Sequence, residues 1–273
     1  PFYNDNGDVV GTIGISREIT HRKKTEEELK SLVEQLKVSK IEMEEVNAEK
    51  DKFFSIIAHD LRSPLLGFLA FTGILSEQLY DLTMREMQDF SKKLQSSAAV
   101  LYRLLENLLE WSRIQRGFIK FNPVDTDLNL LISSNIDIMK QTASLKDITL
   151  SADVPENIYA CVDENMLNTI LRNLISNAVK YTPRGGKVTV SVSEDDKCTI
   201  INVIDTGIGI PEDKVDGLFK ISEKVLRKGT EGEESTGLGL LLVKEYVDKH
   251  KGEIIVKSTE GKGTAFTFTL SKN

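Results

Sequence analysis

Residues 173–182 read NLISNAVKYT, and this stretch decides how the second half of the chain is interpreted. Helical residues three and four apart share a face, so Asn173, Asn177, Lys180 and Tyr181 lie on nearly one side of a predicted helix. Amide oxygens can bind Mg²⁺, which prefers hard oxygen ligands beside phosphates, and a lysine ammonium supplies a point charge to phosphates. The stretch therefore favours a phosphorylated ligand. Two asparagines on a helix are, on their own, more often just a polar surface.

Two glycine-containing strings follow. DTGIGI at 205–210 comes after an apolar strand, and its carboxylate could accept the exocyclic amine of adenine while the glycines let the backbone approach a ligand. TGLGL at 236–240 opens a helix whose N-terminal N–H groups can receive phosphate. The chain has neither a Walker lysine-serine signature nor a GxGxxG at a strand–helix turn, which argues against P-loop and Rossmann nucleotide sites.

A second informative stretch is FSIIAHDLRSPL at 54–65. Each helical residue turns by about 100°, so His59 should point away from the apolar stripe that contains Ile57, and Ser63 should share its face. Neutral imidazole is nucleophilic near pH 7, and a carboxylate such as Asp60 can hold one ring nitrogen as N–H while the other attacks. His59 is therefore a candidate nucleophile. An isolated histidine in this position would more often be only a solvated side chain.

Glycine divides the chain into two kinds of structure. Six of the 18 glycines precede residue 180 and twelve follow it, which predicts long helices first and a loop-rich domain afterwards. Apolar residues recur at heptad spacing over 29–57 and favour a dimeric coiled coil over a single surface helix. Two further stripes, joined by a short connection at 80–83, predict an antiparallel helical hairpin. Two such hairpins would form a four-helix bundle and cover each other's apolar faces.

The residues before the long helix and those after the hairpin follow less regular patterns. Asn4 to Asp8 is a turn cluster, Val9 to Ile15 is predicted as a strand, and a helix is predicted from about Thr20, which can cap it. Gly117 to Asp127 is predicted as a linker. The rest predicts a two-layer α/β domain. Its expected helices are Leu128 to Lys146, Glu164 to Tyr181 and Leu238 to His250, and its expected strands are Lys187 to Ser193, Cys198 to Asp205, Glu253 to Ser258 and Thr264 to Leu270.

Composition narrows the function classes. A net charge of −7 argues against nucleic acid as a partner. The two cysteines, Cys161 and Cys198, make neither a disulfide framework nor a zinc set and are expected to be buried thiols. His21 and His250 are expected to be structural. No apolar run reaches the length of a membrane span, so this segment is expected to be cytoplasmic, while a longer protein starting before Pro1 could be membrane-attached.

The motifs together resemble a known family. Residues 54–65 resemble the phospho-acceptor box of sensor histidine kinases. The three later strings, in this order, resemble the ATP-binding domain of these kinases, the Bergerat fold shared with gyrase-type ATPases. Residues 1–20 resemble the last strand of a PAS sensor domain. The resemblance implies five parts: a PAS-like remnant at 1–20, a signalling coiled coil at 21–50, a dimerisation and phosphotransfer hairpin at 51–120, a linker at 121–127, and the ATP-binding domain at 128–273.

The resemblance also implies roles. His59 would take the γ-phosphoryl group of ATP with Asp60 orienting and deprotonating it, and would pass the group to an aspartate of a response-regulator receiver domain. Asn177 would bind Mg²⁺, Asn173 would support it, and Asp205 would bind adenine. The remaining expected ATP-binding residues are Lys180, Tyr181, Gly207, Gly209, Ile210, Phe219, Thr236, Gly237, Leu238 and Gly239. Homodimers would form through the helical bundle.

Three departures from the family pattern leave alternatives open. Ser235 replaces the glycine that usually begins the second glycine box, the expected lid at 222–235 is acidic, and Ser63 stands where kinases with phosphatase activity often have threonine or asparagine. A non-catalytic dimeric scaffold is the first alternative. A plain ATPase is the second, and it is disfavoured because gyrase-type ATPases carry a water-activating glutamate where this chain has Asn173.

Overall fold

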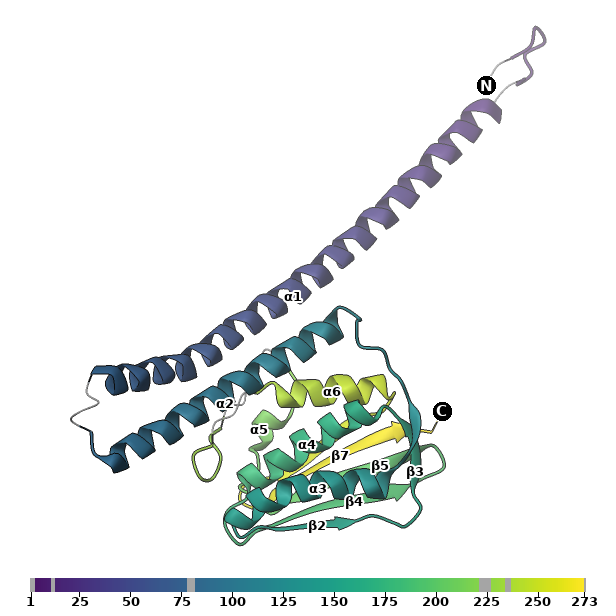
Figure 1. The fold of residues 1–273 in the computed structure, drawn as a ribbon. Helices are drawn as coiled ribbons and strands as arrows, with labels where there is room; N and C mark the ends of the chain where they lie inside the picture. Colours follow the sequence, from purple (N-terminus) through teal and green to yellow (C-terminus); the bar gives the residue numbers. More distant parts are fainter. Residues whose placement is uncertain (1–2, 11–12, 78–81, 221–226, 234–236, 273) are drawn as a thin grey trace. The chain divides into compact units, whose positions relative to one another are not determined.

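A computed structural model of the chain describes residues 3–10, 13–77, 82–220, 227–233 and 237–272 (Figure 1). The chain divides into two compact units, Pro1–Ser55 and Ile56–Asn273. Helix α1 (Ile13–Glu77) belongs to both units, because the boundary falls within it. Among the described residues, none of the helices combines the length and the apolar character needed to cross a membrane.

The first unit contains a turn and the beginning of α1. Asn4 closes the turn by accepting the backbone N–H of Asp8, and Tyr3 and Val9 form an isolated antiparallel bridge. The prediction of a strand through Ile15 and of a helix start near Thr20 was wrong, because α1 already begins at Ile13. A strand needs a neighbouring strand to satisfy its backbone groups, whereas a helix satisfies them internally.

Several apolar heptad positions of α1 lie open in this single chain, although Ile57 at the end of the stripe is buried. Four of them are more than half exposed: Leu29, Leu32, Leu36 and Met43. Scattered exposed apolar residues are common on proteins. A stripe of apolar residues at heptad spacing on one helix, however, matches the surface that a second helix covers in a coiled coil. The coiled coil therefore stays a prediction.

The predicted helical hairpin is confirmed. The end of α1 is followed by α2 (Met84–Gln115), and the ring centroids of Phe71 and Phe90 lie 5.7 Å apart (Figure 1). Thr83 begins α2 with a capping box, in which its hydroxyl accepts the Glu86 N–H and the Glu86 carboxylate accepts the Thr83 N–H. The expected connection at 80–83 lies partly outside the described residues.

The domain that follows is an α/β sandwich, as predicted. Its main sheet has the strand order β2-β4-β5-β7-β6, with β2 parallel to β4 and all other neighbours antiparallel. A separate antiparallel pair joins β1 and β3. The strands are β1 (Val124–Asp127), β2 (Thr149–Asp153), β3 (Tyr159–Val162), β4 (Lys187–Glu194), β5 (Cys198–Asp205), β6 (Ile254–Thr259) and β7 (Gly263–Ser271).

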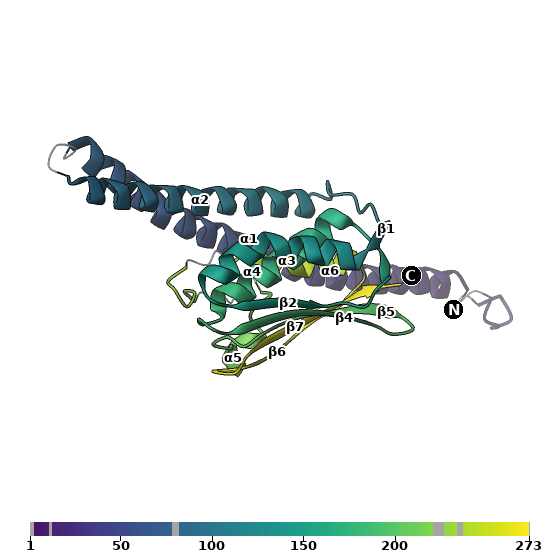
Figure 2. The same ribbon diagram turned by 60° about the horizontal axis from the view of Figure 1, so that its bottom comes forward.

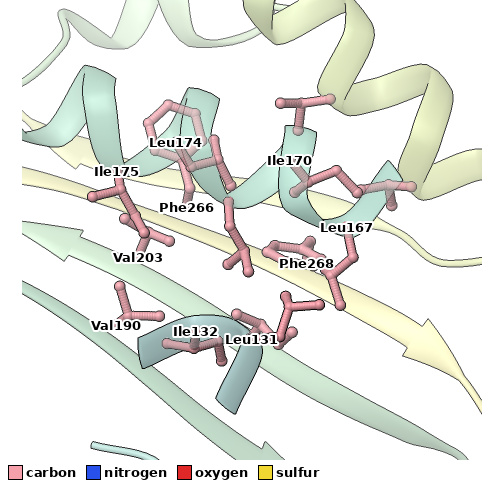
Figure 3. Close-up of a cluster of buried hydrophobic side chains, with 14 of the residues drawn as sticks. Leu131, Ile132, Leu167, Ile170, Leu174, Ile175, Val190, Val203, Phe266 and Phe268 are labelled. Atoms are coloured by element: carbon pink, nitrogen blue, oxygen red, sulfur yellow. The ribbon is translucent and has the colours of Figure 1, made fainter. Parts of the chain in front are cut away.

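Among the described residues, three long helices cover one face of the main sheet (Figure 2). They are α3 (Leu128–Leu145), α4 (Glu164–Tyr181) and α6 (Gly239–Lys249); the short α5 (Glu212–Val215) lies between β5 and α6 in the chain. Asp127 and Asp163 cap α3 and α4 through their carboxylates. Alternate residues of β4, β5 and β7 point into the layer between sheet and helices, where Val190, Val203, Phe266 and Phe268 meet the apolar side of α4 (Figure 3).

Some elements differ from the sequence prediction. The last four residues of the predicted linker form β1, and β2, β3 and α5 were not predicted. These elements are only four or five residues long, and their sequences carry no extended alternation that would have revealed them. The expectation of buried thiols was also wrong, since Cys161 is exposed on β3 and Cys198 is half-buried.

Candidate functional site

The polar face of α4 lies at the edge of the core. Asn173, Asn177, Lys180 and Tyr181 are all half-buried, while the opposite face of the helix is fully buried in the sandwich. The sequence spacing therefore places these side chains on one accessible side. The Lys180 ammonium lies 5.3 Å from the centre of the Tyr181 ring. The arrangement offers two amides and one cation side by side.

Asp205 ends β5 and continues its inward-pointing series. The residue is only 7% exposed, and Oδ1 accepts the N–H groups of Gly207 at 2.7 Å and of Thr264 at 3.2 Å. Burial raises the pKa of this carboxyl to about 6, although both hydrogen bonds oppose the shift. A buried carboxylate with a remaining acceptor oxygen is suited to recognise an amine.

The loop after Asp205 packs tightly between two elements. The Ile208 N–H donates to the Tyr181 carbonyl at the end of α4, and the Ile210 N–H donates to the Ser258 hydroxyl at 2.8 Å. A Cβ atom on Gly207 would lie 2.5 Å from the Tyr181 carbonyl oxygen. Gly209 has φ +65°, and a Cβ there would lie 2.1 Å from the Thr259 carbonyl oxygen. Both glycines are therefore required by packing, whatever else they bind.

The second glycine string also contacts α4. A Cβ atom on Gly239 would lie 2.4 Å from Oδ1 of Asn173, whose amide donates to the Thr169 carbonyl. Gly237 has φ +67°, and Leu238, the residue before α6, is buried and gives no side-chain cap to the helix. The first N–H groups of α6 are thus available to an anion. Thr236, the first residue of this string, lies outside the described residues.

Other expected ATP-binding residues have mainly packing contacts. Phe219 and Ile210 are partly buried against the hydrophobic core. Of the expected lid at 222–235, the structure describes 227–233. There the Tyr181 hydroxyl donates to the Arg227 carbonyl at 3.0 Å, and the Arg227 guanidinium donates to the Gly209 carbonyl. This described part of the lid therefore reaches both α4 and the loop after Asp205.

The acidic character of the lid is offset by specific cations. Glu231 pairs with Arg184 at 2.8 Å, and Glu233 pairs with Lys146 at 2.9 Å. Paired carboxylates repel a triphosphate less than unpaired ones. Glu234 lies outside the described residues. For Glu231 and Glu233, the departure from the family pattern has a structural explanation.

His59 lies in the hairpin, with 79% of its side chain exposed. Its Nδ1 is 3.4 Å from Oδ1 of Asp60, a carboxyl group that is only 11% exposed. Ser63, one turn further, is exposed as well. Periodicity thus predicted the orientation of His59 correctly, and the adjacent carboxylate is within reach of one ring nitrogen.

Sequence reasoning missed several residues that position the site. Thr264, Ser258 and Lys146 make long-range contacts that no local pattern announces. His250 was expected to be structural. It is buried, its Nε2 accepts the Asp163 N–H, and burial lowers its pKa. His250 therefore has a structural role, as a buried and neutral side chain.

Comparisons with known proteins agree with this architecture. Residues 49–117 match the family model "His Kinase A (phospho-acceptor) domain", and residues 162–273 match "Histidine kinase-, DNA gyrase B-, and HSP90-like ATPase". The sensor histidine kinase WalK of Bacillus subtilis is 33% identical over 235 residues, which cover 84% of this chain and 38% of WalK. The chain spans about a third of the length of the curated relatives it matches.

Solved structures share the fold. The histidine kinase AdeS of Acinetobacter baumannii matches with a TM-score of 0.65 and 22% identity, covering 79% of this chain and 98% of that one. The histidine kinase ThkA, solved in complex with the response regulator protein TrrA, matches with a TM-score of 0.65 and 19% identity, covering 84% of this chain and 64% of that one. With a phospho-acceptor domain followed by an ATP-binding domain, the chain belongs to the sensor histidine kinases.

Proposed function

We propose that this chain transfers the γ-phosphoryl group of ATP to His59 and then to an aspartate of a response-regulator receiver domain. The observation that carries the proposal is the exposed His59–Asp60 pair on a phospho-acceptor hairpin, in the same chain as the polar face of α4 and the buried Asp205. Neither half would transfer phosphate alone. Together they supply an acceptor and a nucleotide site.

The acceptor chemistry follows from the geometry at His59. With a hydrogen on Nδ1 directed at Asp60, the lone pair of Nε2 points to solvent and can attack. The Nε2–phosphorus bond forms as the bond from the γ-phosphorus to the bridging oxygen breaks, and ADP leaves. The Nδ1 proton of the positively charged ring passes to the Asp60 carboxylate. Asp60 therefore orients the ring and acts as the base.

The nucleotide would be held by groups that differ in chemistry. Asp205 accepts the adenine amine, and the glycines at 207 and 209 keep the backbone close to the base. Lys180, the loop N–H groups of Gly237 and Leu238 and the first N–H groups of α6, which begins at Gly239, would face the phosphates. Mg²⁺, when bound with ATP, offsets the charge that develops during transfer, and the half-buried Asn177 amide oxygen fits it as a hard ligand beside the phosphates.

The remaining parts of the proposal concern assembly. The exposed heptad stripe of α1 and the hairpin would be covered by a second copy of the chain, giving a coiled coil and a four-helix bundle. Residues 1–20 would be the end of a PAS-like domain. Ser63 would take part in removing phosphate from the regulator. Since ATP is the donor, we place this segment in the cytoplasm.

Two alternatives make different predictions. A non-catalytic scaffold would bind ATP without labelling His59, and the paired Glu231 and Glu233 remove one reason for it. A plain ATPase would release phosphate steadily. An ATPase needs a base to activate water, and gyrase-type ATPases have a glutamate for this purpose where this chain has Asn173. The amide of Asn173, which lies against Gly239, cannot act as that base.

The test is incubation with γ-labelled ATP. The chain should acquire a label that is stable in base and lost in acid, as expected of a phosphohistidine, and His59→Gln should abolish it. His21→Gln is the matched control, because His21 is exposed on the same helix but has no adjacent carboxylate. Equal labelling of the His59 variant, or phosphate release with no label, would refute the proposal.

A further inference from the structure

Lys146 has an unusual environment for a lysine. Its side chain is 5% exposed at the end of α3, and burying an ammonium is costly unless it is fully paired. Nζ lies within hydrogen-bond distance of four acceptors. They are the Val179 carbonyl at 3.1 Å, the Lys180 carbonyl at 3.0 Å, the Thr230 hydroxyl at 2.7 Å and Oε1 of Glu233 at 2.9 Å.

Two of these acceptors belong to the last turn of α4. Carbonyls at a helix end lack partners within the helix, and a cation there is favoured by the helix dipole. The same turn carries the side chains of Lys180 and Tyr181, and the Tyr181 carbonyl accepts the Ile208 N–H. Lys146 therefore fixes the backbone that presents two expected nucleotide-binding residues.

The other two acceptors belong to residues 229–233, which fold into a turn on the same helix end. The Thr230 N–H donates to the Lys180 carbonyl, and the Thr230 hydroxyl reaches the carbonyls of Lys180 and Thr182. A Cβ on Gly229 would lie 2.7 Å from Cγ of Lys180 and 2.3 Å from the Glu233 carboxylate. The turn thus packs directly on the Lys180 side chain.

Glu233 completes the charge balance. Burial alone would raise the pKa of this carboxyl, but the hydrogen bonds from Lys146 and from the backbone hold the pKa below its ordinary value. The ion pair is therefore present at neutral pH. Towards the other end of the segment, Arg227 bonds to Tyr181 and Gly209, so the contacts run from Lys146 to the loop after Asp205.

We propose that Lys146 is a positioning residue of the nucleotide site, which anchors residues 229–233 to the end of α4 and so sets the placement of Lys180 and Arg227 towards ATP. This inference rests on the proposed function. Lys146 itself touches neither the phosphates nor His59 in this role. Its effect is on nucleotide affinity, exerted through the segment it holds.

The test compares the Lys146–Glu233 pair with a second lysine–carboxylate pair that lies within α3. Lys146→Met keeps most of the length of the side chain but removes the ammonium group, and Glu233→Gln removes the negative charge of its partner. The matched controls are Lys140→Met and Asp137→Asn, which break a 3.1 Å pair exposed on the same helix. The Kd for a non-hydrolysable ATP analogue is measured by calorimetry in the full chain, with KM and kcat from autophosphorylation.

We expect Lys146→Met and Glu233→Gln each to raise Kd and KM for ATP about 5- to 20-fold, with kcat at saturating ATP within about twofold of the original. The double variant should be no worse than the poorer single variant, because the pair acts as a unit. Lys146→Arg, which keeps donors and charge, should recover part of the affinity. The two control variants should bind as the original chain does.

Unchanged affinity in Lys146→Met and Glu233→Gln, or a loss of thermal stability and kcat at constant KM, would overturn the inference. If Lys146→Met does not fold, Glu233→Gln still decides, because Lys146 keeps its three other acceptors in that variant. The proposed function fails separately. It fails when the unaltered chain binds the analogue but His59 takes no label.

Discussion

The backbone N–H of Thr264 donates to Oδ1 of Asp205 at 3.2 Å, although the two residues are 59 positions apart. This bond joins the start of β7 to the end of β5 and holds one carboxylate oxygen, together with the Gly207 N–H at 2.7 Å. The second oxygen is then left to select a ligand. Burial raises the pKa of this carboxyl to about 6, which makes Asp205 sensitive to pH in the weakly acidic range.

Asp205 should therefore couple ATP affinity to pH. Its folded pKa is raised above the ordinary value of 3.8, so the folded state holds the proton more tightly. The stability that this gives is fully present below pH 3.8 and is lost as the pH rises through about 6. We expect ATP affinity to fall as pH drops through about 6. Asp205→Asn should bind ATP at least about tenfold more weakly, yet raise stability at pH 7.5 by about 1–3 kcal/mol. Calorimetry and thermal unfolding check the two effects, and a variant that lost both affinity and stability would contradict this account.

Gly207→Ala should destabilise the domain because the new methyl group would meet the Tyr181 carbonyl, a rigid backbone atom at 2.5 Å. We expect a loss of about 1–3 kcal/mol and weaker ATP binding. Gly73→Ala is the matched control, since a Cβ there meets nothing within 4 Å inside helix α1. That change should stabilise the helix by about 0.5–1 kcal/mol. Similar thermal midpoints for the two variants would disagree with the packing described for Gly207.

Asp60→Asn should separate phosphoryl transfer from ATP binding. The amide cannot take the Nδ1 proton of His59, and we expect the rate of autophosphorylation to fall about 10²- to 10⁴-fold. ATP affinity should not change, because Asp60 lies in the hairpin and not among the α4 side chains. Single-turnover labelling and calorimetry measure the two quantities. A normal rate in this variant would remove Asp60 from the mechanism.

His250 should make stability depend on pH in the opposite sense to Asp205. Burial lowers the pKa of His250, although the hydrogen bond to the Tyr246 carbonyl and the Asp163 charge both act to raise it. The unfolded state therefore binds the proton more readily than the folded state. The stability that neutral His250 contributes is fully present above pH 6.5, the ordinary pKa of histidine. It is lost as the pH falls through the lowered pKa of the folded state. His250→Gln should reduce that pH dependence while lowering stability at pH 7.5, because the Asp163 N–H loses its bond to Nε2. Thermal unfolding between pH 5 and 8 tests this, and an unchanged slope would count against it.

Local patterns in the sequence determined much of this protein. The 3.6-residue period predicted both the shared polar face of α4 and the exposure of His59, and alternating or continuous apolar residues predicted β4 and β5. Such patterns depend only on neighbours within one element. The order of the three polar and glycine-containing strings also identified the family before any contact was known.

Only the tertiary structure decided which distant groups complete the site. The short strands β1, β2 and β3 exist because partners elsewhere satisfy their backbone groups, and Ile13 to Ile15 are helical where the sequence suggested a strand. Likewise, Lys146 looked like one more polar residue at a helix end. Its burial against Thr230 and Glu233, more than 80 positions away, follows from how α3, α4 and residues 229–233 meet, and no local periodicity encodes such a meeting.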